Sequence, residues 1–340
     1  MNANKAGAGK GAKEEKARAL WFTGPRVVEL REEVVPPPGP GEITVAADYS
    51  LVSAGSEMRI YRGDGGLKNI MLPTARGTFP FPVKFAYETV GRVVAAGEGS
   101  GYDVGNAVFA AHPHQELFTL NGAFCVKAPK GLVDLRRLVF MSQLGVALCA
   151  LDDVPVRLGE LVVVSGLGLI GSFCAYLARK TAWKLVLIDP IPKRRAAAGW
   201  IGADAVVDPK DAEAVIAELG RGLGVDTYYE ASGAPAALQM AINTTRVEGT
   251  IVAVGWYGTA PVPLILSPEF HVRRLRIVSS QNVAKIQQQK GHYLADVLTG
   301  FDVRPLITHE IPFDRASDAY ALIDQHPAET LGVLLTYSRR

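Results

Sequence analysis

The chain has two parts that differ in the pattern of their apolar residues. From about residue 17 to 150, short β-branched segments such as EITVAADYSLVS and TVGRVVAAG alternate with turn-forming stretches such as PPPGPGE. This pattern is typical of short strands joined by tight turns. From about residue 151 to 280, continuous apolar runs alternate with segments of helical spacing, which predicts a parallel sheet covered on both faces.

Six apolar runs in the second part are the predicted strands of this sheet. They are LVVVSG (161–166), KLVLID (184–189), DAVVD (204–208), DTYYEAS (226–232), TIVAVG (250–255) and RIVSS (276–280). Such strands with helices between them predict an α/β fold with a doubly wound parallel sheet. From about residue 281 the pattern returns to a helix and short strands that end in ETLGVLLTY, and we expect this segment to rejoin the first part.

The predicted domain organisation follows from these two patterns. Residues 1–16 are expected to be a disordered tail, with a partner-binding arm as the alternative, because they are rich in Gly, Ala and Lys. Residues 17–150 and 281–340 are predicted to form a β-rich domain, and residues 151–280 the doubly wound domain. A length of 340 residues agrees with two domains of ~150 residues each.

One stretch of the first part does not follow the strand rhythm. Residues 48–88, DYSLVSAGSEMRIYRGDGGLKNIMLPTARGTFPFPVKFAYE, are rich in Gly, Pro and aromatic residues and show no period. Long ordered loops of this kind usually carry function. We therefore expect this segment to contribute to a functional site.

Composition narrows the class of protein. The chain is 48% hydrophobic and 21% charged, and no apolar run approaches ~20 residues, so we expect no membrane span. No apolar segment typical of a signal peptide is visible, and three cysteines without CxxC spacing fit a reducing cytoplasm. A net charge of +2 gives no reason to expect nucleic acid as a partner.

A glycine-rich motif follows the first strand of the second part. LVVVSGLGLIGSFCAYLA holds a GxGxxG between a valine strand and a helix, and the next strand, KLVLID, ends on an acidic residue. This context predicts a dinucleotide site, in which the glycines allow a tight turn and the helix N-terminus binds the pyrophosphate. The predicted cofactor-binding residues of this turn are Gly166, Leu167, Gly168, Leu169, Ile170 and Gly171.

The end of the second strand bears on the choice of cofactor. Asp189 would accept hydrogen bonds from the adenosine ribose and repel a 2′-phosphate, which favours NAD. Lys193, Arg194 or Arg195 in the next turn could instead receive that phosphate, so NADP stays the alternative. Ser232, Gly233 and Gly255 follow later strands at the edge where ligands bind in such sheets, or only turn the chain there.

The order of the two parts resembles the medium-chain dehydrogenase/reductase (alcohol dehydrogenase-like) superfamily over nearly the whole chain. The stretches that carry the resemblance are SAGSEMRIYRG, AYETVGRVVAAG, GYDVGNAVFA, GLGLIG, EASGAPAAL and GTIVAVG. The resemblance implies a GroES-like β-rich catalytic domain, a Rossmann domain and a homodimer formed through the nucleotide domains. SAGSE with YETVGRVV is similar to the zinc-lacking branch that includes the bacteriochlorophyllide a dehydrogenase, whose tetrapyrrole substrate does not transfer with the motif.

The resemblance also predicts that no zinc is bound. Zinc-dependent members read like CGTDLHIYRG and GHE in the first two stretches, and the Cys and His ligand positions correspond here to Ala54 and Tyr87. The third ligand position corresponds to Ser142 or Gln143. Zinc requires Cys, His or carboxylate donors in tetrahedral geometry, which these residues do not supply. A recruited site that uses Glu57, Glu88, His112 or His114 is the alternative.

Without a metal, hydroxyl and imidazole groups must stabilise or protonate an alkoxide. The resemblance places Ser56 at a proton-passing Ser/Thr and Tyr87 at a ligand position, where a hydroxyl of pKa ~10 suits a proton donor. Glu88 corresponds to a glutamate behind the metal and could orient Tyr87 or Arg59. His114 completes the predicted catalytic set, although each of these side chains could also be purely structural.

Further residues are predicted to line a substrate pocket. His112 and His114 in AAHPHQELF would lie on one face of a strand, with one of them at the cleft. The predicted pocket residues are Glu57, Tyr61, His112 and Trp256, with Lys68 as a further candidate.

The predicted function is a zinc-independent, NAD(P)-dependent oxidoreductase that transfers a hydride between nicotinamide and a carbonyl or secondary alcohol of a small or medium-sized substrate. An enoyl-type reductase or reductive cyclase is the first alternative, because the aromatic loop could wall a bulky pocket. A non-catalytic nucleotide-binding module is the second. The sequence names neither the substrate nor the direction of the reaction.

Overall fold

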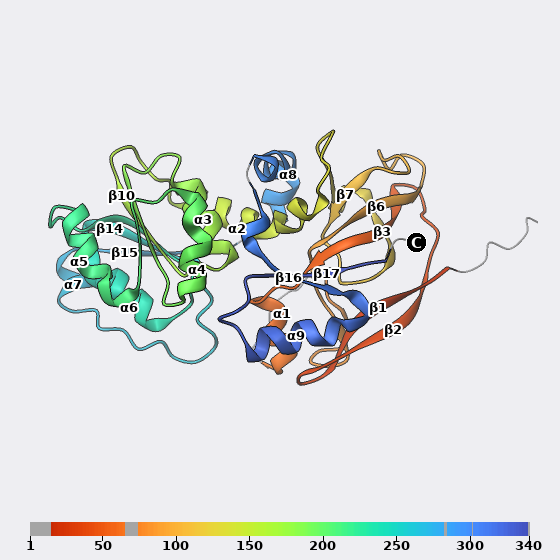
Figure 1. The fold of residues 1–340 in the computed structure, drawn as a ribbon, viewed down its shortest axis with the longest axis horizontal. Helices are drawn as coiled ribbons and strands as arrows, with labels where there is room; N and C mark the ends of the chain where they lie inside the picture. The colour runs from red at the N-terminus through yellow and green to blue at the C-terminus, as the bar shows by residue number, and fades with distance from the viewer. Residues whose placement is uncertain (1–14, 65–73, 282–283, 301, 339–340) are drawn as a thin grey trace, which may run out of the picture.

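The computed structural model describes residues 15–64, 74–281, 284–300 and 302–338. Strands in this part of the chain form three sheets, and Figure 1 shows the six-stranded sheet at one end of the molecule and the β-rich part at the other. Helices α2 (Met141–Asp153) and α8 (Ala284–Thr299) lie between them. The predicted α/β fold with a β-rich part and a doubly wound parallel sheet is confirmed.

The six-stranded sheet has the order β12-β11-β10-β13-β14-β15, and every pair in it is parallel. Its strands are β10 (Leu161–Ser165), β11 (Lys184–Ile188), β12 (Ala205–Val207), β13 (Val225–Glu230), β14 (Thr245–Ala253) and β15 (Arg276–Ser279). The connecting helices are α3 (Leu169–Ala178), α4 (Pro192–Ala197), α5 (Pro209–Leu219), α6 (Pro235–Thr244) and α7 (Glu269–Val272). All five residues of β10 are buried, as expected of a central strand covered by helices on both faces.

The β-rich part contains a seven-stranded and a four-stranded sheet. The first has the order β16-β17-β3-β6-β7-β9 with β8 paired to β3, and the second has the order β2-β1-β5-β4. Their strands are β1 (Glu15–Gly24), β2 (Val27–Val35), β3 (Glu42–Leu51), β4 (Arg76–Gly77), β5 (Val83–Lys84), β6 (Thr89–Ala96), β7 (Ala107–Ala110), β8 (Leu117–Asn121), β9 (Cys125–Lys127), β16 (Ile307–Pro312) and β17 (Gly332–Thr336).

The C-terminal segment joins the seven-stranded sheet. Strand β17 pairs antiparallel with β3, and Leu334 lies opposite Leu51. Helix α9 (Ala316–Gln325) packs its buried face, which includes Tyr320, into a core cluster beside α1 (Ser56–Arg62). The end of the chain therefore lies against the segment that carries the predicted catalytic loop.

The structure differs from the sequence-based expectation at three places. The stretch 48–88 contains the end of β3, helix α1 and the short strands β4 and β5 within its described residues. Strand β1 begins at Glu15, two residues before the expected start of the β-rich domain at residue 17. Residues 112–114 form no strand, because Pro113 has no N–H for a sheet ladder, so the two histidines do not share a strand face.

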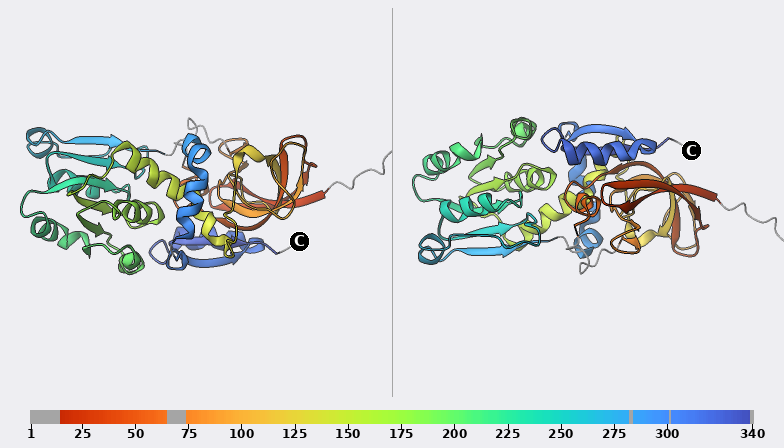
Figure 2. Two further views of the ribbon diagram at one scale, coloured as in Figure 1. Left: turned by 90° about the horizontal axis from the view of Figure 1, so that it is seen from above. Right: turned by 90° about the horizontal axis from the view of Figure 1, so that it is seen from below.

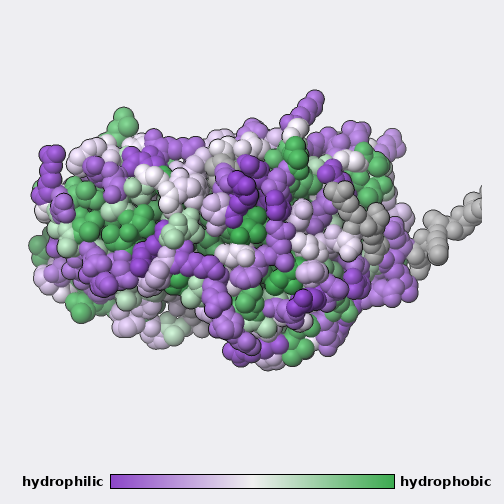
Figure 3. All heavy atoms as spheres, viewed as in Figure 1, coloured by the Kyte–Doolittle hydropathy of each residue, from purple (hydrophilic) through white to green (hydrophobic). Residues whose placement is uncertain are grey.

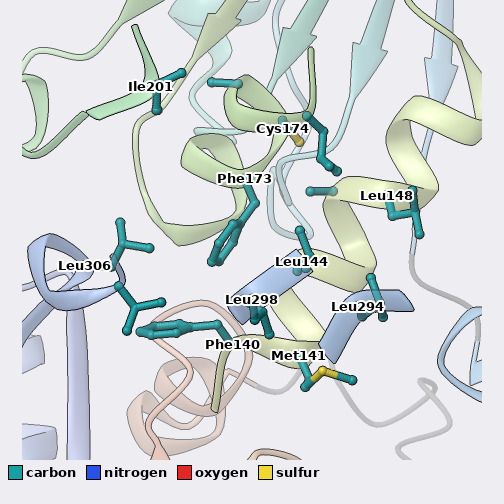
Figure 4. Close-up of a cluster of buried hydrophobic side chains, with 14 of the residues drawn as sticks. Phe140, Met141, Leu144, Leu148, Phe173, Cys174, Ile201, Leu294, Leu298 and Leu306 are labelled. Carbon is teal, nitrogen blue, oxygen red and sulfur yellow. The ribbon is translucent and has the colours of Figure 1, made fainter. Parts of the chain in front are cut away.

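Helix α2 is buried at the junction of the two parts. Leu144 and Leu148 belong to one apolar cluster with Phe173 of α3 and Leu298 of α8 (Figure 4). The same cluster reaches Val90 of the β-rich part, and the two further views agree that α8 crosses the molecule between its ends (Figure 2). This packing fixes the position of α2 relative to the six-stranded sheet and to the β-rich part.

Replacement of Leu144 by alanine tests this junction. Leu144 is fully buried in the cluster, so Leu144→Ala is expected to lower the free energy of unfolding by about 2–5 kcal/mol. Urea denaturation followed by circular dichroism measures the change. Leu158→Ala is the matched control, because Leu158 is 88% exposed and its truncation should change the free energy by less than about 0.5 kcal/mol.

Candidate active site

The glycine turn after β10 has a shape that only glycine permits. Gly166 has a φ of +84°, and a Cβ there would lie 2.5 Å from the backbone N of Ser232. A Cβ on Gly171 would lie 1.8 Å from the carbonyl oxygen of Gly166. A Cβ on Gly168, the N-cap of α3, would meet no protein atom within 4 Å. The first and third glycines therefore close the turn, and the second leaves the helix N-terminus open to a ligand.

Asp189 lies at the end of β11 and is 1% exposed. Its two carboxylate oxygens accept the backbone N–H groups of Leu167, over 2.7 Å, and Ile191, over 2.8 Å. The carboxylate thus ties the glycine turn to the turn after β11. Each oxygen has a second lone pair, so the predicted contact with the adenosine ribose stays a prediction.

In the structure, the basic residues after Asp189 donate hydrogen bonds to backbone carbonyl groups of this chain. Lys193 Nζ donates to the carbonyl of Glu329 over 2.8 Å, and Arg194 donates to the carbonyl of Pro327 over 3.0 Å. Arg195 donates to the carbonyl of Asp189. Lys193 and Arg194 therefore connect α4 with the turn before β17, and the choice between NAD and NADP stays open.

A buried glutamate organises the neighbouring edge of the sheet. Glu230 ends β13 and accepts hydrogen bonds from the backbone N–H groups of Ser232, over 2.7 Å, and Gly233, over 3.1 Å. The hydroxyls of Ser232 and Tyr257 also donate to its carboxylate. A Cβ on Gly255 would lie 2.9 Å from Glu230 Oε2. The three predicted rim residues therefore surround one carboxylate, which sequence analysis missed although it directly precedes ASG.

Three hydroxyl groups meet at the N-terminus of α1. Tyr87 Oη lies 2.8 Å from Ser53 Oγ and donates to Ser56 Oγ over 3.2 Å. Ser56 N–H in turn donates to Ser53 Oγ over 3.3 Å. Tyr87 and Ser56 are partly exposed, whereas Ser53 is buried. The structure thus brings together two predicted catalytic residues and adds Ser53, whose only sequence signal is its place three residues before Ser56.

The geometry of this hydroxyl cluster sets the direction of its hydrogen bonds. A tyrosine hydroxyl has one proton, and here it points to Ser56. Ser53 must then donate to Tyr87, and the proton of Ser56 is left for an oxygen outside the cluster. Burial raises the pKa of Tyr87, so Tyr87 keeps its proton at neutral pH.

Glu57 and His114 lie behind this cluster in the interior. Their exposed fractions are 0% and 1%, and His114 Nε2 lies 2.9 Å from Glu57 Oε2. Glu57 also accepts from Ser53 N–H over 3.0 Å and from Tyr320, and His114 Nδ1 lies 2.7 Å from Ser50 Oγ. Both ring nitrogens and both carboxylate oxygens are thus engaged within the protein. Glu57 and His114 are placed to position Ser53, and neither faces the surface.

Glu88 is fully buried beside Tyr87. Gln143 Nε2, in the first turn of α2, donates to Glu88 Oε2 over 2.6 Å. Burial raises the pKa of Glu88 well above its ordinary value, and the hydrogen bond from Gln143 opposes this. The structure therefore places Glu88 beneath the hydroxyl cluster, in contact with α2 and not with Arg59.

The predicted pocket residues are dispersed. Trp256 is 45% exposed, and the guanidinium of Arg59 lies 5.0 Å from its ring and donates to its carbonyl over 3.3 Å. Tyr61 is buried in a core cluster 5.4 Å from the ring of Tyr320. His112 stacks on Phe118, and burial lowers the pKa of His112 to about 3, so its ring is neutral. Lys68 lies outside the described residues.

The residues at the expected zinc position do not form a zinc site. Ala54 has no donor atom, Tyr87 is bound to two serines, and Gln143 is bound to Glu88. Across the described ranges, no group of three or more His, Cys, Asp or Glu side chains is placed to hold a metal ion.

Within the same ranges, no helix is both long enough and apolar enough to traverse a bilayer.

A doubly wound parallel sheet with an open glycine turn, joined to a β-rich part that carries the hydroxyl cluster, defines a dinucleotide-binding dehydrogenase fold. The family model described as zinc-binding dehydrogenase matches residues 169–295. The 2-desacetyl-2-hydroxyethyl bacteriochlorophyllide A dehydrogenase of Rhodobacter capsulatus is 28% identical over 328 residues, covering 91% of this chain and 95% of that protein. The chain belongs to the medium-chain, alcohol dehydrogenase-like dehydrogenase/reductase superfamily.

Solved structures show the same fold. L-idonate 5-dehydrogenase of Escherichia coli superposes with a TM-score of 0.81 at 19% identity, covering 95% of this chain and 99% of that one. A short chain alcohol dehydrogenase of Escherichia coli, complexed with NADH, gives a TM-score of 0.77 at 20% identity and covers 94% and 99%. Together the comparisons support an NAD(P)-dependent oxidoreductase of the dehydrogenase type.

Two glycine variants should separate folding from cofactor binding. Gly171→Ala is expected to lower the unfolding free energy of the protein without cofactor by about 1–3 kcal/mol or more, because its Cβ meets the Gly166 carbonyl. Gly168→Ala should leave this free energy nearly unchanged and weaken NADH binding by about tenfold or more, because its Cβ stands where the pyrophosphate approaches. Thermal unfolding and NADH fluorescence titration measure the two effects.

Gly199→Ala is the matched control for both variants. Gly199 lies in the short helix after α4, and a Cβ there meets no atom within 4 Å. Gly199→Ala should change neither the free energy of unfolding nor the affinity for NADH. Full NADH affinity in folded Gly168→Ala would contradict the assignment of the glycine turn to the cofactor.

Proposed function

We propose that this protein is a zinc-independent, NAD(P)-dependent oxidoreductase that interconverts a carbonyl and a secondary alcohol of a small or medium-sized organic substrate. The observation that carries the proposal is the hydroxyl cluster of Ser53, Tyr87 and Ser56, which includes Tyr87, the residue predicted from the family resemblance to stand at a metal-ligand position. A zinc ion stabilises the developing alkoxide as a Lewis acid, and hydroxyl groups can instead stabilise it by hydrogen bonds and protonate it.

The proposed proton path follows the hydrogen bonds of the cluster. Ser56 is the partly exposed member whose proton is not used within the cluster, so it donates to the substrate oxygen in the reductive direction. Tyr87 passes a proton to Ser56 and recovers one from solvent, to which Tyr87 is partly exposed, while Ser53 keeps its proton and donates to Tyr87 to hold its orientation. In the oxidative direction the protons move the opposite way.

Buried groups keep the cluster in place. Glu57 holds the backbone N–H of Ser53, and His114 and Tyr320 hold Glu57. The predicted participation of His114 in the reaction itself therefore becomes a proposed positioning role.

The nucleotide would bind along the glycine turn, with its pyrophosphate at the N-terminus of α3. A bound nicotinamide supplies or accepts the hydride. Gly168, Leu169 and Ile170 at this terminus are partly exposed, which suits a ligand there. Asp189 holds the turn in shape through Leu167 N–H.

An activity screen tests this function. Purified protein with NADH or NADPH is offered ketones, enones and alcohols while nicotinamide absorbance is followed, and bound metals are measured in parallel. We expect turnover of a ketone or alcohol by protein without stoichiometric zinc. Turnover of enones alone would favour the enoyl-reductase alternative. Tight cofactor binding without turnover of any class would favour a non-catalytic module, and stoichiometric zinc would refute the metal-free mechanism.

Variants of the cluster test the proton path. Ser56→Ala is expected to lower kcat by about 10²–10⁴-fold, since it removes the group that donates to the substrate. Tyr87→Phe should also lower kcat and should leave the affinity for NADH unchanged. Tyr102→Phe is the matched control, because Tyr102 also donates one hydrogen bond, to the carbonyl of Cys125, away from the cluster. Undiminished kcat in Tyr87→Phe would remove Tyr87 from the path.

We also propose that the protein is a homodimer formed along the free edge of the six-stranded sheet. Strand β15 ends the order of that sheet and presents Ile277 with 37% exposure. Ile265 and Val272, in the segment before it, are 68% and 69% exposed. Figure 3 shows the opposite face of the molecule, where hydrophobic and hydrophilic residues are interspersed. An exposed edge with apolar neighbours is a surface that a second strand can pair with.

The mass in solution tests the dimer. Light scattering after size exclusion should give twice the mass of one chain for the wild type. Ile277→Arg should shift the protein towards the monomer, because it places a charge within the paired edge. Val133→Arg is the control, since Val133 is 93% exposed on a loop outside the six-stranded sheet. A monomeric wild type would overturn the proposal.

A further inference from the structure

Two buried oxygen atoms below the hydroxyl cluster have no hydrogen-bond partner. They are Oε1 of Glu88 and Oε1 of Gln143, whose residues are 0% and 6% exposed. The remaining atoms of the same two groups are joined, since Gln143 Nε2 donates to Glu88 Oε2 over 2.6 Å. Buried acceptors without a donor are rare and costly. A carboxylate facing an amide would therefore leave this site with two unsatisfied acceptors.

One proton would satisfy both atoms. A protonated carboxyl group has an O–H donor and a C=O acceptor, and a primary amide has N–H donors and a C=O acceptor. We propose that Glu88 and Gln143 form an uncharged acid–amide pair, in which Glu88 Oε1–H donates to Gln143 Oε1 and Gln143 Nε2–H donates to Glu88 Oε2. Both orphan oxygens and both donors are then used within one pair of side chains.

The surroundings favour the uncharged form. Burial is the largest cause that raises the pKa of Glu88, and the negative charge of Glu57 in α1 acts in the same direction. The hydrogen bonds of Gln143 and Ser142 in α2 lower the pKa of Glu88, but the net change is a rise. Tyr87, the neighbour in the chain, is itself uncharged at neutral pH because its own pKa is raised.

Glu57 provides the contrast within the same site. It is also 0% exposed, but its three contacts, with Ser53 N–H, His114 and Tyr320, can all be donors. Such a set suits a carboxylate, whereas Glu88 receives side-chain hydrogen bonds from Gln143 and Ser142 only, and its Oε1 and the Oε1 of Gln143 have no partner. Two glutamates of equal burial thus differ in the hydrogen-bond partners that surround them.

The pair has two consequences. Its carboxyl group is uncharged and committed to Gln143, so it is not available as an anionic ligand where zinc-binding relatives hold their metal. An uncharged Glu88 also removes a negative charge that would hinder the loss of the Tyr87 proton. The protonation state does not depend on the proposed reaction, and only this second consequence rests on it.

The variant Glu88→Gln tests the proposal without a substrate. Its amide can donate to Gln143 Oε1 and accept from Gln143 Nε2, so both bonds are kept. In the wild type, the stabilisation from the protonated carboxyl is complete below the ordinary pKa of 4.5. It is lost as the pH rises towards and through the pKa that Glu88 has in the folded protein. Glu88→Gln has no such loss, so its unfolding equilibrium constant relative to wild type should fall by about tenfold per pH unit from pH ~5 upward.

Glu57→Gln is the matched control, because it replaces a glutamate of equal burial whose partners are donors. It should destabilise the protein at every pH between ~5 and ~8, since its amide N–H₂ faces a donor. The proposal is overturned if Glu88→Gln is destabilised to the same extent as Glu57→Gln and gains nothing with rising pH. Urea unfolding at several pH values measures both variants.

A second measurement uses the wild type and needs no variant to fold. Protein with ¹³C at the glutamate side-chain carboxyl carbon is titrated by NMR, and the Glu88 signal is assigned by its absence in Glu88→Gln or in Glu88→Ala. The expected result is a carboxyl signal that stays in its protonated position through neutral pH. A signal that titrates near 4.5, or that is already ionised at pH ~5, would overturn the proposal.

Discussion

The burial of helix α2 is the constraint on which the rest of the site depends. Its apolar side chains pack against α3 of the nucleotide sheet and α8, in one cluster that also reaches the β-rich part. Its first turn carries Gln143, which holds Glu88 below the hydroxyl cluster. Because well-packed interiors do not deform continuously, the glycine turn and the hydroxyl cluster are held at a fixed relation by this one helix. A hydride transfer needs this relation, since both reactants must be aligned.

Polar groups in the site are arranged in layers from the surface inward. Ser56 and Tyr87 are partly exposed, Ser53 lies behind them, and Glu57 lies deepest, bound to His114 and Tyr320. Each deeper group restrains the one above it and has its own partners. Hydroxyl groups that donate to a substrate need this support, because a hydroxyl is useful only in one orientation.

Buried carboxyl groups also organise the turns at the edge of the six-stranded sheet. Glu230 gathers the turns after β13 and β14, and Asp189 joins the turns after β10 and β11. Both use backbone N–H donors, which satisfy a carboxylate in the interior. Glu88 has no such set of backbone donors and is held by the side chain of Gln143 instead.

Local pattern was sufficient to predict the six parallel strands, the glycine turn and the return of the C-terminal strands, because apolar period and glycine spacing are properties of neighbouring residues. The family resemblance, and not local pattern, placed Ser56, Tyr87 and Glu88 in the predicted catalytic set. Local pattern could not predict that Ser53 joins them, that His114 and Tyr61 are buried, or that residues 112–114 form no strand. The bonds Tyr87–Ser53, Gln143–Glu88 and Tyr320–Glu57 join residues separated by 34, 55 and 263 positions. Only the tertiary structure decides such contacts, since no local period records which distant side chain will satisfy a buried polar group.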